Sequence, residues 1–141
     1  MTTASDADVI VAGAGIAGAT LALALHQAGL KPVLIDPVVF DAQLAPTFDG
    51  RASAIAYAAF RQWRQLGLAA DLEPHAQRIE QILVTDGHTP GAATGAGAPF
   101  FLRFDSAEIA DTSDGEPLGY LLENRHIRAA LAKAVMAAGI E

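Results

Sequence analysis

Three glycines between two apolar segments place the strongest constraint on the fold of this chain. Residues 8–12 (DVIVA) are rich in β-branched side chains and predict a short buried strand. Residues 16–28 predict a helix that Gly29 ends, and residues 33–36 (VLID) predict a second strand. A strand, a helix and a second strand within about thirty residues predict a βαβ unit over 8–36, with parallel strands and a right-handed crossover.

The glycines have the spacing Gly13-x-Gly15-x-x-Gly18, and Asp36 follows at the end of the second strand. Gly13 permits a tight turn, Gly15 lets a pyrophosphate approach the backbone, and Gly18 lets the helix pack closely on the sheet. The first turn of the helix offers N–H groups to an anion. A carboxylate at Asp36 can accept hydrogen bonds from ribose hydroxyls and would repel a 2′-phosphate, which disfavours an NADP-type adenosine. The predicted cofactor-binding residues of this unit are Gly13, Gly15, Ile16, Ala17, Gly18 and Asp36.

A tight turn without a ligand is the alternative, because a chain with 13 glycines can produce such a spacing by chance. The strand before the glycines, the helix after them and the acid at Asp36 together favour dinucleotide binding. FAD and NAD both carry an adenosine and a pyrophosphate, so the motif alone leaves the choice between them open.

Composition limits the other classes of function. The chain has 141 residues, enough for one domain, with a net charge of −7 and no cysteine. We therefore expect no disulfide, no thiolate metal site and no nucleic-acid partner, and the dispersed histidines predict no metal site. Residues 1–8 lack a basic cluster and no apolar segment is long enough to span a bilayer, which favours a cytoplasmic location.

Beyond the βαβ unit, helical and strand-like segments continue to alternate. The expected elements are a loop over 37–50, a helix over about 52–66, a strand over 78–86, a strand over 100–105 and a helix over 125–139. Phe60 and Trp63 have helical spacing and predict core positions. Residues 87–99 are low in complexity, and Asp86-Gly87 predicts a turn.

Three further segments resemble the flavoprotein aromatic hydroxylases of the para-hydroxybenzoate hydroxylase type. They are FDGRASAIAYAAFRQWRQLGL at 48–68, IEQILVTDG at 79–87 and LGYLLEN at 118–124. The likeness is closer to the branch that hydroxylates polyprenylated phenols in ubiquinone biosynthesis. It implies an α/β, Rossmann-like FAD-binding fold, with residues 1–141 as an incomplete FAD-binding domain. Residues 79–104 would then be strands and a loop from the start of the substrate region.

The resemblance also implies site residues and a reaction. Arg51 would contact the ribityl or pyrophosphate part of FAD. Asn124 would place a polar side chain on the cofactor, and Arg125 is the alternative residue for that role. The parent enzyme would be an FAD-dependent monooxygenase that hydroxylates a phenol or polyprenyl phenol with NAD(P)H and O2. A polyprenyl substrate would bring the full-length enzyme into peripheral contact with a membrane.

Two later motifs of the family would lie beyond position 141, so we expect the isolated chain to be inactive as a hydroxylase. Other enzymes share the glycine turn, among them FAD-dependent amine or hydroxy-acid oxidases and NAD-dependent dehydrogenases. The segment around Arg51 argues against both. A non-catalytic nucleotide-binding fragment is the alternative from a different class.

Overall fold

The computed structural model describes residues 6–38, 48–85, 101–109 and 115–141. Its N-terminal part is the predicted βαβ unit: β1 (Val9–Ala12), α1 (Ile16–Gln27) and β2 (Pro32–Ile35). The two strands pair in parallel, with Val9 opposite Pro32 and Ala12 opposite Ile35. Gly29 has a φ of +86°, the left-handed conformation that a helix-terminating glycine adopts without strain. The mixed α/β fold and the parallel strand pair are thus as expected.

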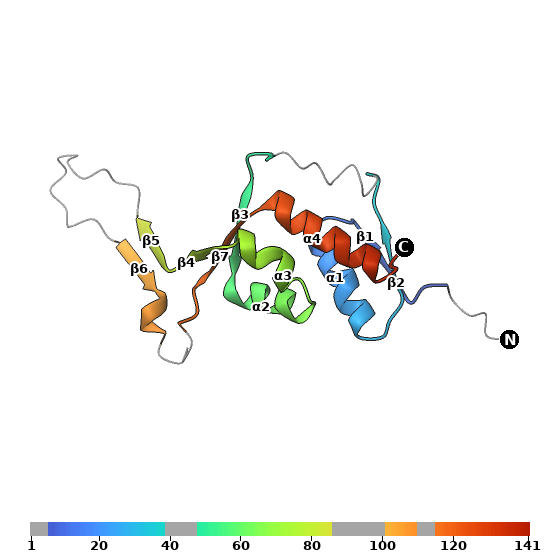
Figure 1. Cartoon of the computed structure of the whole chain (residues 1–141), viewed down its shortest axis with the longest axis horizontal. Coiled ribbons are helices and arrows are strands. Elements are labelled where there is room, and N and C mark those ends of the chain that lie inside the picture. Colours follow the sequence, from blue (N-terminus) through green and yellow to red (C-terminus); the bar gives the residue numbers. More distant parts are fainter. Residues whose placement is uncertain (1–5, 39–47, 86–100, 110–114) are drawn as a thin grey trace.

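A second, antiparallel sheet follows in the chain. It has the order β3-β7-β4 and consists of β3 (Ala52–Ala56), β7 (Gly119–Glu123) and β4 (Gln77–Ile79). Between β3 and β4 lie α2 (Tyr57–Gln65), α3 (Ala69–Leu72) and the short 3-10 helix η2 (Glu73–His75). The long helix α4 (Asn124–Ala137) follows β7 and lies beside α1 and α3 in Figure 1.

The prediction of a helix over 52–66 is wrong for residues 52–56. Residues 52–56 form β3, and the helix begins only at Tyr57. Alanine favours helices in isolation, but here the main chain pairs with β7, from Ala52 opposite Glu123 to Ala56 opposite Gly119. Ser53 and Ile55 are half-buried while the three alanines that alternate with them are exposed, which is the alternation of a strand with one covered face.

The strand expected over 78–86 is divided into β4 and β5 (Gln81–Thr85), with Glu80 between them. β5 pairs antiparallel with β6 (Phe101–Asp105), which agrees with the strand expected over 100–105. This hairpin and the 3-10 helix η3 (Ser106–Glu108) project away from the helices (Figure 1). The expected turn at Asp86-Gly87 and the segment 87–99 lie outside the described residues.

The core lies among α1, α2, α3, α4 and β7. Phe60 of α2 is fully buried and its ring packs on that of Tyr120 with centroids 4.1 Å apart. Trp63 is 5% exposed, so both aromatic residues are in the core as expected. Burial of each large apolar side chain contributes roughly 1.5–3 kcal/mol. The largest fully buried side chains are Phe60, Leu68, Leu72, Leu122, Ile127 and Leu131.

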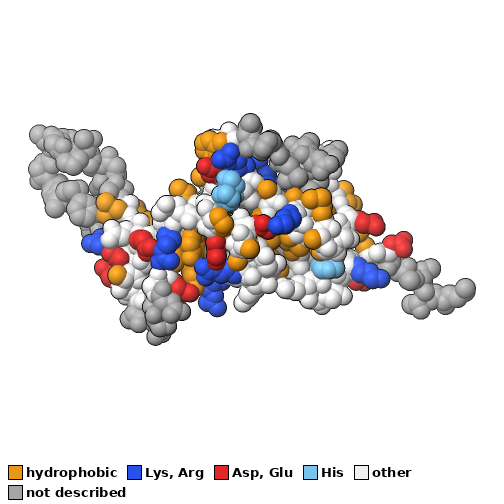
Figure 2. Space-filling view, in the orientation of Figure 1, with side chains coloured by type: hydrophobic (Ala, Val, Ile, Leu, Met, Phe, Trp, Pro, Cys, Tyr) orange, Lys and Arg blue, Asp and Glu red, His pale blue; other side chains and the backbone are white. Residues whose placement is uncertain are grey.

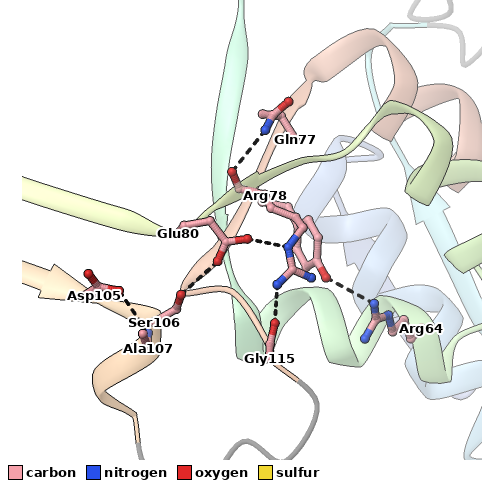
Figure 3. A network of polar contacts seen from close by, with 9 residues as sticks. Arg64, Gln77, Arg78, Glu80, Asp105, Ser106, Ala107 and Gly115 are labelled. Carbon is pink, nitrogen blue, oxygen red and sulfur yellow. Dashed lines mark hydrogen bonds and ion pairs between the residues drawn. The ribbon is translucent and has the colours of Figure 1, made fainter.

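A polar network fixes the base of the projecting hairpin (Figure 3). Glu80 accepts hydrogen bonds from Arg78 Nε at 2.6 Å and from Ser106 Oγ at 2.9 Å, and its main-chain carbonyl accepts from the Ser106 N–H. The Arg78 guanidinium holds the pKa of Glu80 below its usual range and also donates to the Gly115 carbonyl. The Glu80 carboxylate therefore joins β4 to η3 and sets where the hairpin leaves the body of the molecule.

The face of the molecule shown in Figure 2 carries acidic and basic side chains among hydrophobic ones. Several apolar side chains of the hairpin are exposed, including Leu83 at 62% and Phe104 at 47%. Within the described ranges, no helix combines the length and the hydropathy needed to cross a membrane.

Candidate cofactor-binding site

The turn between β1 and α1 is held against the end of β2. Gly13 has a φ of +102°, and its N–H donates to the Ile35 carbonyl at 2.7 Å. Gly15 is the N-terminal cap of α1, and no side chain caps the helix there. The Gly15 carbonyl accepts the first helical hydrogen bond from Ala19 at 2.9 Å. Ile16, Ala17 and Gly18 therefore form the first turn, whose N–H groups have no acceptor within the helix.

Gly18 permits the close approach of this helix to the turn. A Cβ at Gly18 would lie 1.8 Å from the Gly13 carbonyl oxygen and 3.4 Å from Cγ1 of Val11. No rotation of a side chain could relieve the first of these contacts, because the obstructing atom belongs to the main chain. The structure therefore requires glycine at this position for internal packing, the role that the motif predicts for it.

Gly15 has a different environment. A Cβ built there meets no heavy atom of the chain within 4 Å, and the residue is exposed. The open space at Gly15 adjoins the N-terminus of α1, where the partial positive charge of the helix favours an anion. The chain itself does not require glycine at this position, so a need for glycine would come from a ligand that lies against the backbone.

Asp36 lies directly beside this turn. One carboxylate oxygen, Oδ2, accepts the Ala14 N–H at 2.7 Å, and the other, Oδ1, accepts the Val38 N–H at 2.8 Å. The glycine motif predicts a ribose contact for Asp36, but it carries no signal that this side chain binds its own turn. A carboxylate oxygen can accept more than one hydrogen bond, so a carboxylate that binds main-chain N–H groups can also accept bonds from hydroxyl donors.

A chain of side-chain hydrogen bonds connects α2 to the first turn of α1. Trp63 Nε1 donates to Thr20 Oγ1 at 3.0 Å, and the Thr20 hydroxyl donates to the Ile16 carbonyl at 2.7 Å. The buried Trp63 thereby fixes the part of the helix that would face a phosphate. The sequence predicts that Trp63 is a core residue, but it carries no signal for the hydrogen bond to Thr20, which is 43 positions away.

Arg51 and Asn124, the other two predicted site residues, are neighbours. Arg51 immediately precedes β3 and Asn124 is the first residue of α4, and the Asn124 N–H donates to the Arg51 carbonyl at 3.0 Å. The Ser53 hydroxyl donates to Asn124 Oδ1 at 2.6 Å. This bond occupies the amide oxygen and leaves the two N–H donors of the Asn124 amide for other partners.

Arg125, the alternative to Asn124, is engaged elsewhere. Its Nε donates to Glu123 Oε2 at 2.6 Å, and its guanidinium lies 5.8 Å from the centroid of the Phe48 ring. These contacts favour Asn124 over Arg125 as the polar group offered to a ligand.

A histidine pair lies next to these residues. The rings of His75 and His126 stack with centroids 3.7 Å apart and planes within 9° of parallel. Burial lowers the pKa of His126, electrostatic interactions with His75 and Arg125 lower it further, and Glu123 opposes the shift. His126 is therefore neutral at pH 7. Stacked rings do not converge on a common ion, and no cluster within residues 6–38, 48–85, 101–109 and 115–141 has the composition of a metal site.

A pocket of about 490 Å³ lies at the opposite end of the parallel strands. His26, Lys31, Pro32 and Ile140 are among its lining residues, and none of the predicted cofactor residues belongs to it. The glycine turn follows the carboxyl end of β1, which is the edge where parallel sheets bind their ligands. We therefore place the candidate site at the turn and not at this pocket.

The fold and the turn together define an α/β dinucleotide-binding protein, and a family comparison gives its class. The model of the FAD binding domain family matches residues 6–133 of the chain. The chain belongs to this family of FAD-binding domains.

Two curated relatives extend the comparison. The chain is 40% identical over 125 residues to ubiquinone hydroxylase UbiL of Rhodospirillum rubrum, covering 89% of this chain and 26% of that protein. It is 28% identical over 129 residues to ubiquinone hydroxylase UbiM of Neisseria meningitidis, covering 91% of this chain and 26% of that protein. The chain thus spans about a quarter of the length of these relatives. The resemblance to the ubiquinone-biosynthesis hydroxylases is confirmed.

A solved structure shows the same fold. The crystal structure of p-nitrophenol 4-monooxygenase PnpA from Pseudomonas putida superposes with a TM-score of 0.64 at 22% identity, covering 92% of this chain and 29% of that one.

Proposed function

We propose that this chain is the FAD-binding part of a flavin-dependent monooxygenase that hydroxylates a phenolic ring in ubiquinone biosynthesis, with NAD(P)H as reductant and O2 as oxidant. The observation that carries the proposal is the geometry of the β1–α1 turn. The chain's own packing excludes a side chain at Gly18, whereas the space beside Gly15 is open and Asp36 is adjacent. The family of FAD-binding domains and the relatives named as ubiquinone hydroxylases support the same assignment.

The residues of this chain would act by binding and orienting the cofactor. The N–H groups of Ile16, Ala17 and Gly18 would face the pyrophosphate, and Asp36 would accept hydrogen bonds from the adenosine ribose. Arg51 would place a guanidinium on the diphosphate or ribityl chain, where charge-assisted hydrogen bonds are strong. Asn124 would donate from its amide nitrogen, since Ser53 occupies its oxygen.

FAD, when bound, would supply the electron transfer and oxygen activation that no side chain can provide. The protein would hold and shield the cofactor, so we assign no catalytic residue in this chain. Residues 79–104, which include the β5–β6 hairpin, would belong to the substrate side of the full-length enzyme. A polyprenyl phenol as substrate would bring that enzyme into peripheral contact with a membrane.

Separate titrations with FAD and NAD test the cofactor assignment. We expect saturable quenching of flavin fluorescence when the chain is added to FAD, and no comparable affinity for NAD. Tight binding of NAD without binding of FAD would instead indicate a dehydrogenase.

The reaction is tested in the full-length enzyme. We expect phenol-dependent oxidation of NAD(P)H that yields a ring-hydroxylated product. A yellow protein that oxidises no NAD(P)H with any phenol would contradict the hydroxylase assignment and favour a non-catalytic nucleotide-binding protein.

A further inference from the structure

The main chain of Arg51 is held from two sides. Its carbonyl accepts the N–H of Asn124 from α4, and its own N–H donates to Oδ1 of Asp49 at 3.1 Å. Residues 48–51 therefore lie against the first turns of α4 (Figure 1). These contacts fix the position from which the Arg51 side chain begins.

Asp49 is in turn held by a residue from α4. Its second oxygen, Oδ2, accepts a hydrogen bond from Arg128 Nη2 at 2.9 Å. Arg128 lies four residues after Asn124 and so on the same side of the helix. The Asp49 side chain is 33% exposed and that of Arg128 is 26% exposed, so water reaches both partners of this pair. The hydrogen bond from Arg128 lowers the pKa of Asp49, which is ionised at neutral pH.

The exposed Arg51 guanidinium has neither a hydrogen bond nor an ion pair with any residue in the described part of the chain, but it lies close enough to Asp49 for its charge to help lower the pKa of that carboxyl. An aspartate two residues away is a natural ion-pair partner for it, because the two charges attract. Asp49 is committed elsewhere: one oxygen binds the Arg51 main chain and the other binds Arg128. The positive charge of Arg128 therefore offsets the negative charge of the Asp49 carboxylate, two residues from Arg51.

We propose that Arg128 and Asp49 form a positioning pair that keeps the Arg51 guanidinium available to FAD. The inference rests on the proposed function, since it assumes that Arg51 contacts the cofactor. Neither Arg128 nor Asp49 touches FAD in this scheme. Without the Arg128 charge, the Asp49 carboxylate can form an ion pair with the Arg51 guanidinium. When the charges of Arg128 and Asp49 are both removed, no carboxylate at position 49 competes with FAD for Arg51.

The test measures the FAD affinity of the full-length enzyme, by fluorescence quenching, in a series of variants. We expect roughly three- to tenfold weaker binding for Arg128→Gln, a range usual for residues coupled through direct contacts. Arg128→Lys, which keeps the positive charge, should bind nearly as well as the unsubstituted enzyme. The double variant Arg128→Gln with Asp49→Asn should recover most of the affinity. In an Arg51→Gln background, Arg128→Gln should cause no further loss.

The matched control is Lys133→Gln. Lys133 lies on the same helix and forms an ion pair with Asp71 at 2.7 Å, away from the Arg51 segment. This variant should bind FAD like the unsubstituted enzyme, and the melting temperature of each variant should stay close to the original, because exposed ion pairs contribute little stability.

Three results would overturn the inference: equal affinities for Arg128→Gln and the unsubstituted enzyme, equal losses for Arg128→Gln and Lys133→Gln, or a further loss when Asp49→Asn is added to Arg128→Gln. A further loss in the double variant would indicate that Arg128 and Asp49 have a purely structural role, because the effects of the two substitutions on FAD affinity would then add up. Failure of the unsubstituted full-length enzyme to bind FAD would instead overturn the proposed function, and the inference with it. The two failures are therefore distinguishable.

Discussion

The close packing of α1 on its own preceding turn gives the sharpest prediction. In Gly18→Ala, the added Cβ begins 1.8 Å from the Gly13 carbonyl oxygen, and real Cβ atoms essentially never approach within 3.0 Å. The helix or the turn must therefore move by about 1.2 Å before the methyl group fits. Gly13 is itself anchored to the Ile35 carbonyl, so the turn cannot yield without breaking that hydrogen bond.

The expected cost follows from two opposing effects. Overpacking of this kind destabilises proteins by about 1–3 kcal/mol. Alanine in a helix is more favourable than glycine by about 0.5–1 kcal/mol, which offsets part of the cost. Because an approach of 1.8 Å is far below the 3.0 Å limit, the overpacking cost should lie in the upper part of its range, at about 2–3 kcal/mol. The net loss of unfolding free energy is then about 1–2.5 kcal/mol, which for a chain of this size lowers the melting temperature by roughly 3–10 °C. The assay is thermal unfolding without cofactor, followed by circular dichroism.

Gly15→Ala is the matched comparison, since its Cβ would meet no atom of the chain within 4 Å. We expect a stability loss of no more than about 1 kcal/mol, from the poorer capping by alanine. FAD affinity should fall at least about tenfold, because the methyl group occupies space that the pyrophosphate needs. An unchanged or higher melting temperature for Gly18→Ala would refute the packing argument. Unchanged FAD affinity for Gly15→Ala would refute the placement of the pyrophosphate.

Three other substitutions test the fold around the site. Trp63→Phe keeps the ring in the core but removes the hydrogen bond to Thr20, and should cost about 1 kcal/mol in denaturant unfolding; no change would mean that this bond does not stabilise α1. Burial lowers the pKa of His126 below its ordinary value of 6.5, so the unfolded chain takes up a proton more readily and stability should fall as the pH drops below about 6.5. Unfolding midpoints of His126→Gln should depend less on pH in this range, and an identical pH profile would contradict the assignment. Gly119→Ala places a Cβ 2.3 Å from the Ile55 carbonyl oxygen on the paired strand, and should cost about 1–3 kcal/mol by the same measurement, with wild-type stability as the contrary result.

The βαβ unit could be predicted because its determinants are local. The β-branched residues of 8–12, the glycine turn and Asp36 lie within one short segment, and each favours the same structure. Asp36 also shows the limit of that reasoning. The motif predicts an acid at the strand end, but the hydrogen bond from Ala14 depends on how the turn folds back in three dimensions.

Other parts of the structure depend on partners distant in the sequence. Residues 52–56 are alanine-rich and suggest a helix, but they form a strand because β7 supplies the pairing partner. Asp49 and Arg128 are 79 residues apart, so no local pattern could connect them. Family resemblance alone predicts Arg51 and Asn124 as site residues, and the hydrogen bond between their main chains makes them neighbours in the structure.

The hydrogen bond between Asp36 and the Ala14 amide means that the carboxylate is immobilised before any ligand arrives. Ordering a mobile side chain on association typically costs about 0.5–1.5 kcal/mol of conformational entropy, and here that loss occurs when the protein folds. A ribose would therefore meet a preorganised acceptor. The same bond should shield the Ala14 amide proton from exchange with solvent even in the cofactor-free protein, so the turn would be rigid in advance of binding.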